Sequence, residues 1–389
     1  EFIPILYKGK QNLPIKSICQ ISQNELCLGT DGKGTKIFNI PKQLITDYPF
    51  DNNYLDSGTS KVHSVLKDNA GNLWIAIYQK GVMMIPAQPN SFKYIGYKSI
   101  NKNIIGSNCI TSLCRDHKGI LWIGTDNDGI YGITTELKQK VHYAPHDSPS
   151  SVPSTVFGLY EDSEHNLWFG SYTNGLGRLD KKTGQCSYLQ NLTDKNGNRI
   201  QRVYDLVEDQ DKRLWIATMG AGLFYYDLKT GQSVYDPKFN AATKKYKWIS
   251  CLLYAGDNHL YVGTYDGIRC IDLSTDDFKT EEILSRHIIH SLYEDPQGNI
   301  WIGNSEGLAE WNPQTQQLKT YTTAHGLSSN AVYAIKGDGQ DNLWISTNAG
   351  MSRFNLNTHT FSNFYADDGL QGNEFSKNCL LYTSDAADD

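Results

Sequence analysis

The sequence has no apolar run near the ~18 residues that a membrane-spanning helix requires. Its first residues, EFIPILYKGK, lack the charged head and the apolar stretch of a secretory signal. These absences exclude a spanning segment within the 389 residues. A mature or truncated extracytoplasmic region would have the same features.

An excess of charge of one sign is also missing. With 36 Lys and Arg against 42 Asp and Glu, the formal net charge is only -6. No global field therefore favours binding to nucleic acid or to an anionic membrane surface. We expect no nucleic-acid partner for this region.

Recognisable catalytic and metal-binding motifs are absent. The sequence contains no H-E-x-x-H, no G-x-S-x-G and no phosphate-cradling loop, and its ten His are scattered without ligand spacing. The D-N-D-G run at 126–129 resembles the start of a calcium loop, but the bidentate Glu that ends such a loop is missing. We therefore predict no metal, no cofactor and no catalytic residue.

Cysteine pairs with a familiar spacing are lacking as well. The eight Cys include no C-x-x-C pair. Most of them lie in apolar strand patterns such as SICQI and ISCLLY, where a free thiol behaves as a small hydrophobe. This placement predicts buried, unpaired thiols.

What the sequence does contain is one pattern repeated many times. A step of the form LWIGT recurs in eight copies, 47, 48, 46, 47, 46, 40 and 43 residues apart, and six of the eight Trp fall on its second residue. In every copy a β-branched residue precedes that position by twelve residues and opens an alternating strand. These β-branched residues are Ile15, Val62, Ile110, Val156, Val203, Ile249, Ile289 and Val332.

Each copy predicts four short antiparallel strands. The alternating strand is followed by a turn rich in Asp, Gly and Asn, the LWIGT strand, a second turn ending in Gly, a third strand and a weaker fourth strand. Helical periodicity is absent almost everywhere. Four-stranded units that recur every 40 to 48 residues predict an all-β fold, a β-propeller with one repeat per blade.

The repeated aromatic residue has a structural explanation in this fold. One blade alone would expose both of its faces, and packing blades around an axis buries the aromatic ring between neighbours. We predict blade-packing roles for Trp74, Trp122, Trp168, Trp215, Tyr261, Trp301 and Trp344.

Paired acids recur at the turn between the first and second strands, as Glu161-Asp162, Glu208-Asp209 and Glu294-Asp295. Two carboxylates perform catalysis in glycosidases, but a catalytic pair is expected once in a chain. We predict that these repeated pairs are scaffolding.

The repeat resembles that of the two-component regulator propeller family, best seen in DHKGILWIGTDNDG and EDPQGNIWIGNSEG. In that family two seven-bladed propellers precede an immunoglobulin-like domain, a membrane helix and a histidine kinase, and a stretch like DGLQGNEF (368–375) precedes the last blade. The resemblance implies two C-terminal blades of a first propeller in 1–91. It further implies six blades plus the start of a seventh in 92–381, and a non-native or disordered tail in 382–389. The alternative is one eight-bladed ring closed by its termini.

Candidate ligand residues follow from the fold. In a propeller, the loops that enter the innermost strands and the loops between the second and third strands share the face around the channel, which is the default ligand site. Several of these positions depart from a background of small polar residues. The candidate ligand-binding residues are Arg202, Trp248, Arg286, His287, Tyr172, Tyr265, Asp126, Asn127, Asn174, Asn304 and Glu306.

These residue types suit a sugar, because aromatic faces pack on its C–H surface and fixed polar groups bind its hydroxyls. Arg202 with Arg286 and His287 would also suit a carboxylate or a sulfate, since guanidinium groups bind oxyanions bidentately.

The resemblance implies the periplasmic sensor of a hybrid two-component system that binds an oligosaccharide without transforming it. The full ectodomain would pair as a homodimer, and membrane attachment and histidine kinase activity would lie outside this fragment. The output would be control of polysaccharide-utilisation genes. Two alternatives stay open, a propeller glycoside hydrolase or lyase with a unique acid pair, and a protein–protein interaction scaffold with a broad apolar patch.

Overall fold

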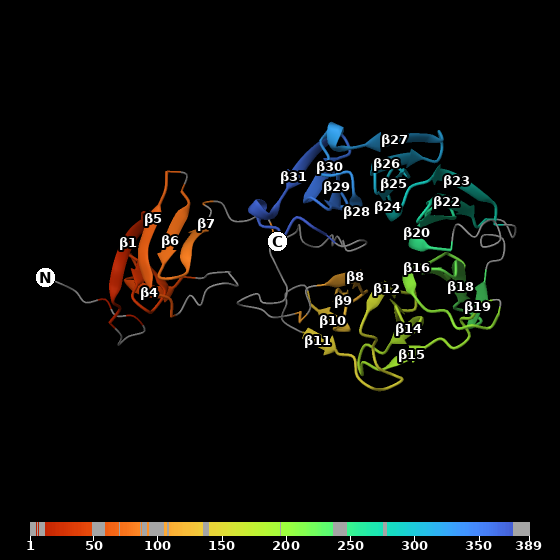
Figure 1. Cartoon of the computed structure of the whole chain (residues 1–389), viewed down its shortest axis with the longest axis horizontal. Coiled ribbons are helices and arrows are strands. Elements are labelled where there is room, and N and C mark those ends of the chain that lie inside the picture. The colour runs from red at the N-terminus through yellow and green to blue at the C-terminus, as the bar shows by residue number, and fades with distance from the viewer. Residues whose placement is uncertain are drawn as a thin grey trace. The chain divides into compact units, whose positions relative to one another are not determined.

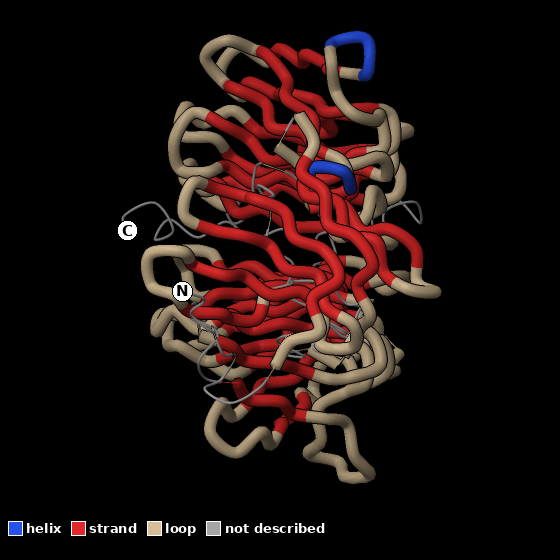
Figure 2. Tube along the Cα trace, turned by 90° about the vertical axis from the view of Figure 1, so that its left-hand side faces the viewer, coloured by secondary structure: helices blue, strands red, loops and turns tan. Residues whose placement is uncertain are grey.

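The structure is a computed structural model that describes residues 5, 7, 12–48, 59–69, 71–85, 87, 92, 105, 106, 109–134, 140–194, 196–235, 247–274 and 278–375. Strands dominate these residues, and the described helical segments are two short 3₁₀ turns, η2 (Thr323–His325) and η3 (Ala366–Asp368) (Figure 2). The predicted all-β class is confirmed. Within the described part of the chain, no helix is long and apolar enough to cross a membrane.

The chain divides into two compact units, residues 1–104 and 105–389. The first unit contains a four-stranded sheet and a three-stranded sheet. Their strands are β1 (Ile15–Ser22), β2 (Glu25–Thr30), β3 (Thr35–Asn39) and β4 (Leu44–Asp47), then β5 (Val62–Lys67), β6 (Leu73–Ile77) and β7 (Gly81–Ile85). The predicted boundary after residue 91 and the predicted tail stay predictions, because residue 91 and residues 376–389 lie outside the described residues.

The described residues of the second unit form six four-stranded antiparallel sheets, the predicted blades, with their strands in sequence order across each sheet. The first strands lie nearest the centre of the unit, and each contacts the next (Figure 1). They are β8 (Ile110–Arg115), β12 (Val156–Glu161), β16 (Val203–Glu208), β20 (Ile249–Ala255), β24 (Ile289–Glu294) and β28 (Val332–Gly337).

The remaining strands follow outward in each blade. The second strands are β9 (Leu121–Thr125), β13 (Leu167–Ser171), β17 (Arg213–Thr218), β21 (His259–Thr264), β25 (Ile300–Asn304) and β29 (Asn342–Thr347). The third strands are β10 (Ile130–Ile133), β14 (Leu176–Leu179), β18 (Leu223–Asp227), β22 (Gly267–Asp272), β26 (Gly307–Asn312) and β30 (Met351–Asn355). The outermost are β11 (Lys140–Tyr143), β15 (Cys186–Tyr188), β19 (Gln232–Tyr235), β23 (Thr280–Ser285), β27 (Gln317–Tyr321) and β31 (Thr360–Phe364).

The repeated Gly and the repeated β-branched residue form one contact between neighbouring blades. A Cβ added to Gly170 would lie 2.8 Å from Val203 Cγ1 of the following blade, and one on Gly303 would lie 2.7 Å from Val332 Cγ1. Both Val side chains are buried. The missing Cβ therefore lets the inner strand of one blade approach the second strand of the blade before it.

The repeated aromatic residue lies in the blade interface. Trp122, for example, packs with Val156 and Leu167 of the following blade. The predicted packing role is confirmed for the residues that are at most 3% exposed, which are Trp122, Trp168, Trp215, Tyr261 and Trp301.

Two of the predicted packing residues differ. Trp74 is 40% exposed, and Trp344 is half-buried. Each belongs to the last described blade of its unit, so no described blade of that unit follows to cover its ring. The prediction of a buried packing role is wrong for Trp74, because the neighbouring blade, and not the motif itself, buries the indole.

Cys27, Cys186, Cys251 and Cys270 are free thiols that are buried, as predicted. Burial raises the pKa of the Cys27 and Cys186 thiols to about 12, which keeps them protonated at neutral pH. Cys109 is exposed, so the prediction of burial is wrong there.

Candidate functional site

The two sets of loops predicted to share a face are hydrogen-bonded to each other. Within one blade the Tyr265 N–H donates to the Trp248 carbonyl at 3.1 Å, and between blades the Arg202 N–H donates to the Tyr172 carbonyl at 3.2 Å. The loops that precede the inner strands therefore lie at the same end of the ring as the turns between second and third strands. This end is called the mouth below.

Four of the predicted ligand residues form a cluster at the mouth. The Arg202 guanidinium carbon lies 5.1 Å from the centre of the Tyr172 ring, and the rings of Trp248 and Tyr265 lie 5.8 Å apart at 69°. Tyr172 and Trp248 expose 43% and 44% of their surface. The cluster therefore presents aromatic surface next to a fixed positive charge.

Two aromatic residues that the sequence analysis missed join this cluster. Phe157 stacks on Tyr204 with ring centres 4.3 Å apart and meets the Tyr172 ring edge-on at 5.9 Å. Burial, with Tyr265 and Tyr172 contributing, raises the pKa of Tyr204 to about 12, so its hydroxyl stays neutral. Tyr204 therefore joins the Tyr172 side of the cluster through Phe157.

A shared irregularity of the backbone places these two residues. Every inner strand has a register shift after its first residue, as between Val156 and Gly158 and between Val203 and Asp205. Such a bulge re-aims the extra side chain, which is Phe157 in one blade and Tyr204 in the next. An aromatic residue directly after the β-branched residue is the signal that could have found them.

The inner strands of all six blades line a cavity of about 160 Å³ that contains one carboxylate. Asp205 accepts the Leu252 N–H of the next blade at 2.8 Å and the Leu206 N–H at 2.9 Å. Burial raises the pKa of this carboxyl to about 6. The equivalent residues in the other five blades are all small or uncharged, namely Ser112, Gly158, Cys251, Ser291 and Ala334.

A second group of predicted residues forms an ion pair farther round the ring. His287 Nε2 lies 3.1 Å from Glu306 Oε2, and His287 Nδ1 lies 2.7 Å from the Ser285 carbonyl. Arg286 is exposed beside them, and its N–H donates to the Asp266 carbonyl at 2.9 Å. Because Glu306 already faces His287, an anion bound to His287 would meet a like charge there.

The remaining predicted residues lie in the turns between second and third strands. Asp126 accepts the Thr155 hydroxyl of the next blade at 2.8 Å, and Asn127 and Asn174 are exposed. Asn304 is only 2% exposed and accepts the Glu306 N–H of its own turn at 2.7 Å. Asn304 therefore closes its turn and does not face the mouth.

The repeated acids occupy the opposite end of the ring unit. In four blades of this unit an Asp accepts the indole N–H of the Trp six residues later at 2.7 to 2.9 Å, in the pairs Asp116–Trp122, Asp162–Trp168, Asp209–Trp215 and Asp295–Trp301. Asp68 and Trp74 form the same contact in the first unit. Where a Glu precedes the Asp, as at Glu161, Glu208 and Glu294, it accepts a backbone N–H from the previous blade, for example from Ser163 to Glu208 at 2.6 Å. These contacts confirm that the repeated pairs are scaffolding.

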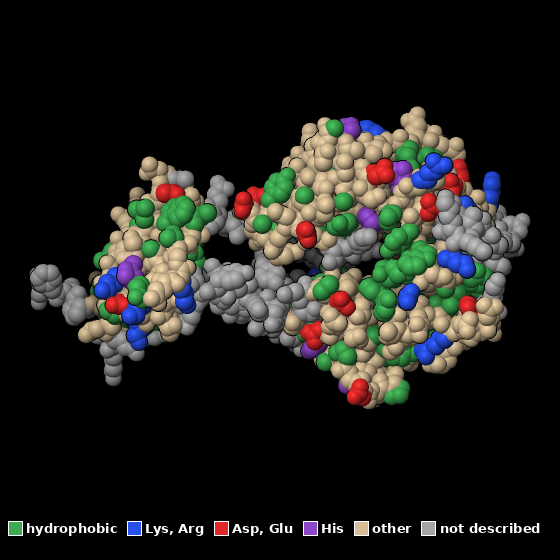
Figure 3. Space-filling model, viewed as in Figure 1, with side chains coloured by type: hydrophobic (Ala, Val, Ile, Leu, Met, Phe, Trp, Pro, Cys, Tyr) green, Lys and Arg blue, Asp and Glu red, His purple; other side chains and the backbone are tan. Residues whose placement is uncertain are grey.

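Charged side chains of both signs are interspersed on the face shown in Figure 3. This matches the mild net charge of -6 and gives no extended single-sign area on the described part of that face.

The fold and the repeated interface define a β-propeller protein, and comparisons with known proteins identify the family that its repeats match. Five stretches match the two component regulator propeller family, namely residues 104–127, 150–173, 194–220, 283–306 and 326–349. The chain carries repeats of this family. The sequence has no significant match among curated proteins.

Solved structures with a similar fold come from B. thetaiotaomicron. The extracellular domain named as the hybrid two component system BT3049 is 23% identical with a TM-score of 0.76, and the alignment covers 94% of this chain and 48% of that one. The extracellular domain named as the hybrid two component system BT4673 is 21% identical with a TM-score of 0.64, covering 95% and 50%. The chain therefore spans about half the length of these structures.

Proposed function

We propose that this chain is part of the periplasmic sensing region of a hybrid two-component system and that it binds an oligosaccharide at the mouth. Binding would change how two ectodomains pair, and segments outside this chain would pass that change through the membrane to a histidine kinase. The kinase would then control genes for polysaccharide use. Such coupling requires a ligand that binds one pairing state more tightly than the other.

One observation carries the binding proposal. The exposed ring of Tyr172 lies against the Arg202 guanidinium, and the exposed ring of Trp248 lies at the same end of the ring, where the loops differ from blade to blade. Such rings offer a flat apolar surface to a pyranose, and Arg202 offers several fixed donors to its hydroxyl or acid groups. The family match and the fold of the extracellular domains support the sensing role.

A sensing role without turnover is supported by the positions of the acids. The repeated Glu-Asp pairs hold turns at the end opposite the mouth. At the mouth, Glu306 is paired with His287. The channel carboxylate, Asp205, accepts two backbone N–H groups, and it has no carboxylate partner in the equivalent position of another described blade.

Calorimetric titration with neutral, uronic and sulfated oligosaccharides tests the proposal. We expect saturable binding of one class, weakened at least about tenfold, or 1.4 kcal/mol, by Trp248→Ala and by Arg202→Ala. Tyr78→Ala is the matched control, because Tyr78 is a 50% exposed aromatic residue in the first unit. A selective loss of acidic sugars in Arg202→Ala would assign the guanidinium to an acid group.

Two results would contradict the proposal. Binding that survives both mouth variants would place the site elsewhere, and release of reducing sugar during the titration would show a hydrolase. If no oligosaccharide of the panel binds, and a periplasmic protein binds to the same surface, the chain would be a scaffold.

A further inference from the structure

Three metal-ligating side chains converge between two neighbouring blades, at the end opposite the mouth. His117 lies in the turn after β8, Glu161 ends β12, and His165 lies in the turn after β12. One ligand atom from each lies within 4.8 Å of the other two. His117 Nδ1 is 2.8 Å from Glu161 Oε1, and the two imidazole rings stack with centres 3.7 Å apart.

The scaffold of the blade interface holds this cluster in place. Glu161 also accepts the His117 backbone N–H at 2.6 Å, as the equivalent Glu does at other interfaces. His165 donates its backbone N–H to the Asp162 carbonyl at 2.8 Å. Both imidazoles are exposed, so their rings can rotate toward a common ion.

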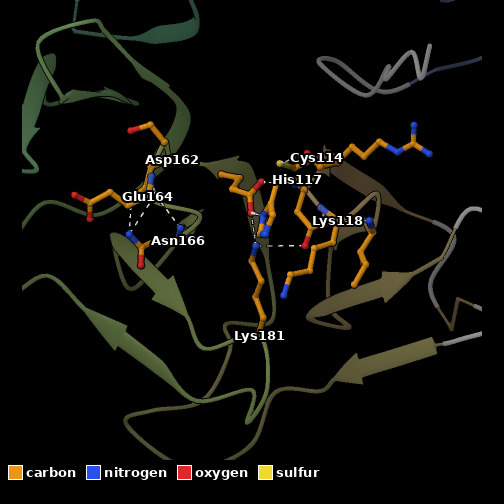
Figure 4. Close-up of polar contacts among 12 residues, drawn as sticks. Cys114, His117, Lys118, Asp162, Glu164, Asn166 and Lys181 are labelled. Atoms are coloured by element: carbon orange, nitrogen blue, oxygen red, sulfur yellow. Dashed lines mark hydrogen bonds and ion pairs between the residues drawn. The ribbon is translucent and has the colours of Figure 1, made fainter. Parts of the chain in front are cut away.

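The cluster already attracts one cation. The Lys181 ammonium forms an ion pair with Glu161 and lies 3.3 Å from Asp116. Figure 4 shows the Lys181 side chain reaching from its own turn into the polar contacts beside His117. An incoming metal ion would therefore compete with Lys181 for Glu161, and Asp116 would keep the displaced ammonium paired.

The next interface along the chain uses the same three positions with different chemistry. Ser163 replaces His117, Glu208 replaces Glu161 and Lys212 replaces His165. The Ser163 N–H donates to Glu208 at 2.6 Å, and the Lys212 ammonium lies 3.4 Å from the same carboxylate. His165 and Lys212 share a left-handed backbone, with φ of 68° and 69°. The position that carries an ammonium at one interface thus carries an imidazole at the other.

Two imidazole nitrogens and one carboxylate oxygen form a ligand set that Zn²⁺ and its transition-metal neighbours favour, whereas Mg²⁺ and Ca²⁺ prefer oxygen ligands alone. Metal–ligand bonds of about 2.0 to 2.2 Å bring ligand atoms to about 3.4 Å from one another. The three ligand atoms already lie within 4.8 Å of one another, so only a small movement of the side chains is required. We propose that His117, Glu161 and His165 bind one transition-metal ion of the Zn²⁺ class, which ties the turns of two adjacent blades together.

Titration of the chelator-treated chain with Zn²⁺, followed by calorimetry, tests this site. We expect the wild type to bind one Zn²⁺ per chain and the double variant His117→Ser, His165→Lys to bind none. This variant carries the residues of the neighbouring interface, so it should fold with an unchanged melting temperature in the absence of metal. His142→Ala is the control, because His142 faces a single carboxylate, Asp128, at 3.3 Å.

Two further variants should increase Zn²⁺ binding. Lys181→Met removes the competing ammonium and should tighten Zn²⁺ binding several-fold. Ser163→His with Lys212→His copies the site into the next interface and should raise the stoichiometry by one ion per chain.

Other metal ions test the ligand set in the wild type. Bound Co²⁺ should show the visible absorption of a site with nitrogen ligands, and calorimetric titration with Mg²⁺ should produce no heat of binding.

Two outcomes would overturn the proposal. The first is the absence of Zn²⁺ binding in the wild type, and the second is undiminished binding in the His117→Ser, His165→Lys variant.

Discussion

The two ends of the ring unit differ in how strictly they repeat. At one end an Asp accepts the indole N–H of the same blade, as Asp209 does from Trp215 at 2.8 Å, and a Glu reaches the preceding turn. At the mouth, by contrast, equivalent positions hold residues as unlike as Arg202 and Ala331. The comparison teaches that one end specifies blade packing, which leaves the other end free to acquire a binding surface.

The largest expected effect is on the packing end. Trp215→Ala should lower the free energy of unfolding of its unit by about 3–5 kcal/mol, because it empties a buried indole site. Trp74→Ala should cost much less, since Trp74 is 40% exposed. Urea denaturation of both variants checks this, and equal losses would contradict the role of the covering blade.

Removing the carboxylate beneath a buried Trp should rank next. Asp209→Ala leaves the Trp215 indole N–H and the Arg213 Nε–H, which donates to Asp209 at 2.6 Å, without their acceptor, although the same guanidinium still pairs with Asp211. We expect a loss of about 2–3 kcal/mol in unfolding free energy. The paired variant Asp68→Ala should lose less, because water can reach the exposed Trp74. Thermal melts of the two variants would decide, and a larger loss in Asp68→Ala would refute the argument.

The channel carboxyl should show a pH-dependent effect of similar or smaller size. The folded pKa of Asp205 is raised to about 6, so folding favours its protonated form. That stability is fully present below the unfolded pKa of about 3.9 and is lost as the pH rises through about 6. At pH 7.5, Asp205→Asn should therefore be more stable than the wild type, by on the order of 2 kcal/mol.

Denaturation at several pH values measures this difference. The advantage of Asp205→Asn should shrink as the pH falls from 7.5 toward 4, because the wild-type carboxyl then becomes neutral as well. A difference that is constant over this range would show that packing, and not ionisation, separates the two proteins.

The smallest effect on stability is expected at the mouth. Trp248 is 44% exposed and Arg202 is exposed, so Trp248→Ala and Arg202→Gly should change the free energy of unfolding by less than about 0.5 kcal/mol. Gly also accepts the left-handed backbone of Arg202, whose φ is 54°. A loss as large as that of Trp215→Ala would show that the mouth residues are structural.

Much of the fold could be predicted from the sequence, because the pattern reports local geometry. The β-branched residue, the Gly of LWIGT and the Trp recur at fixed spacings, and the structure brings Val203 onto Gly170 and buries Trp215 as that spacing requires. The exposure of Trp74 could not be predicted, since burial depends on a neighbouring blade and not on the motif.

The candidate site could be predicted only in part. Topology placed Arg202, Tyr172, Trp248 and Tyr265 at one end of the ring, which the backbone hydrogen bonds bear out. Phe157 and Tyr204 reach the cluster through a bulge that the spacing does not show. His117 and His165 lie 48 residues apart in the sequence, so their proximity comes from the stacking of blades and leaves no spacing motif.

The hydrogen bonds between these Glu side chains and the preceding turns allow the blade interfaces to be measured separately. The amide protons of His117, Ser163 and Gly256 are bonded to Glu161, Glu208 and Glu294 of the following blades. Each of these protons becomes free to exchange with solvent when its own Glu contact breaks. Hydrogen exchange at these three amides would therefore measure the opening of three interfaces one at a time, and it would show how far a perturbation at one interface spreads around the ring.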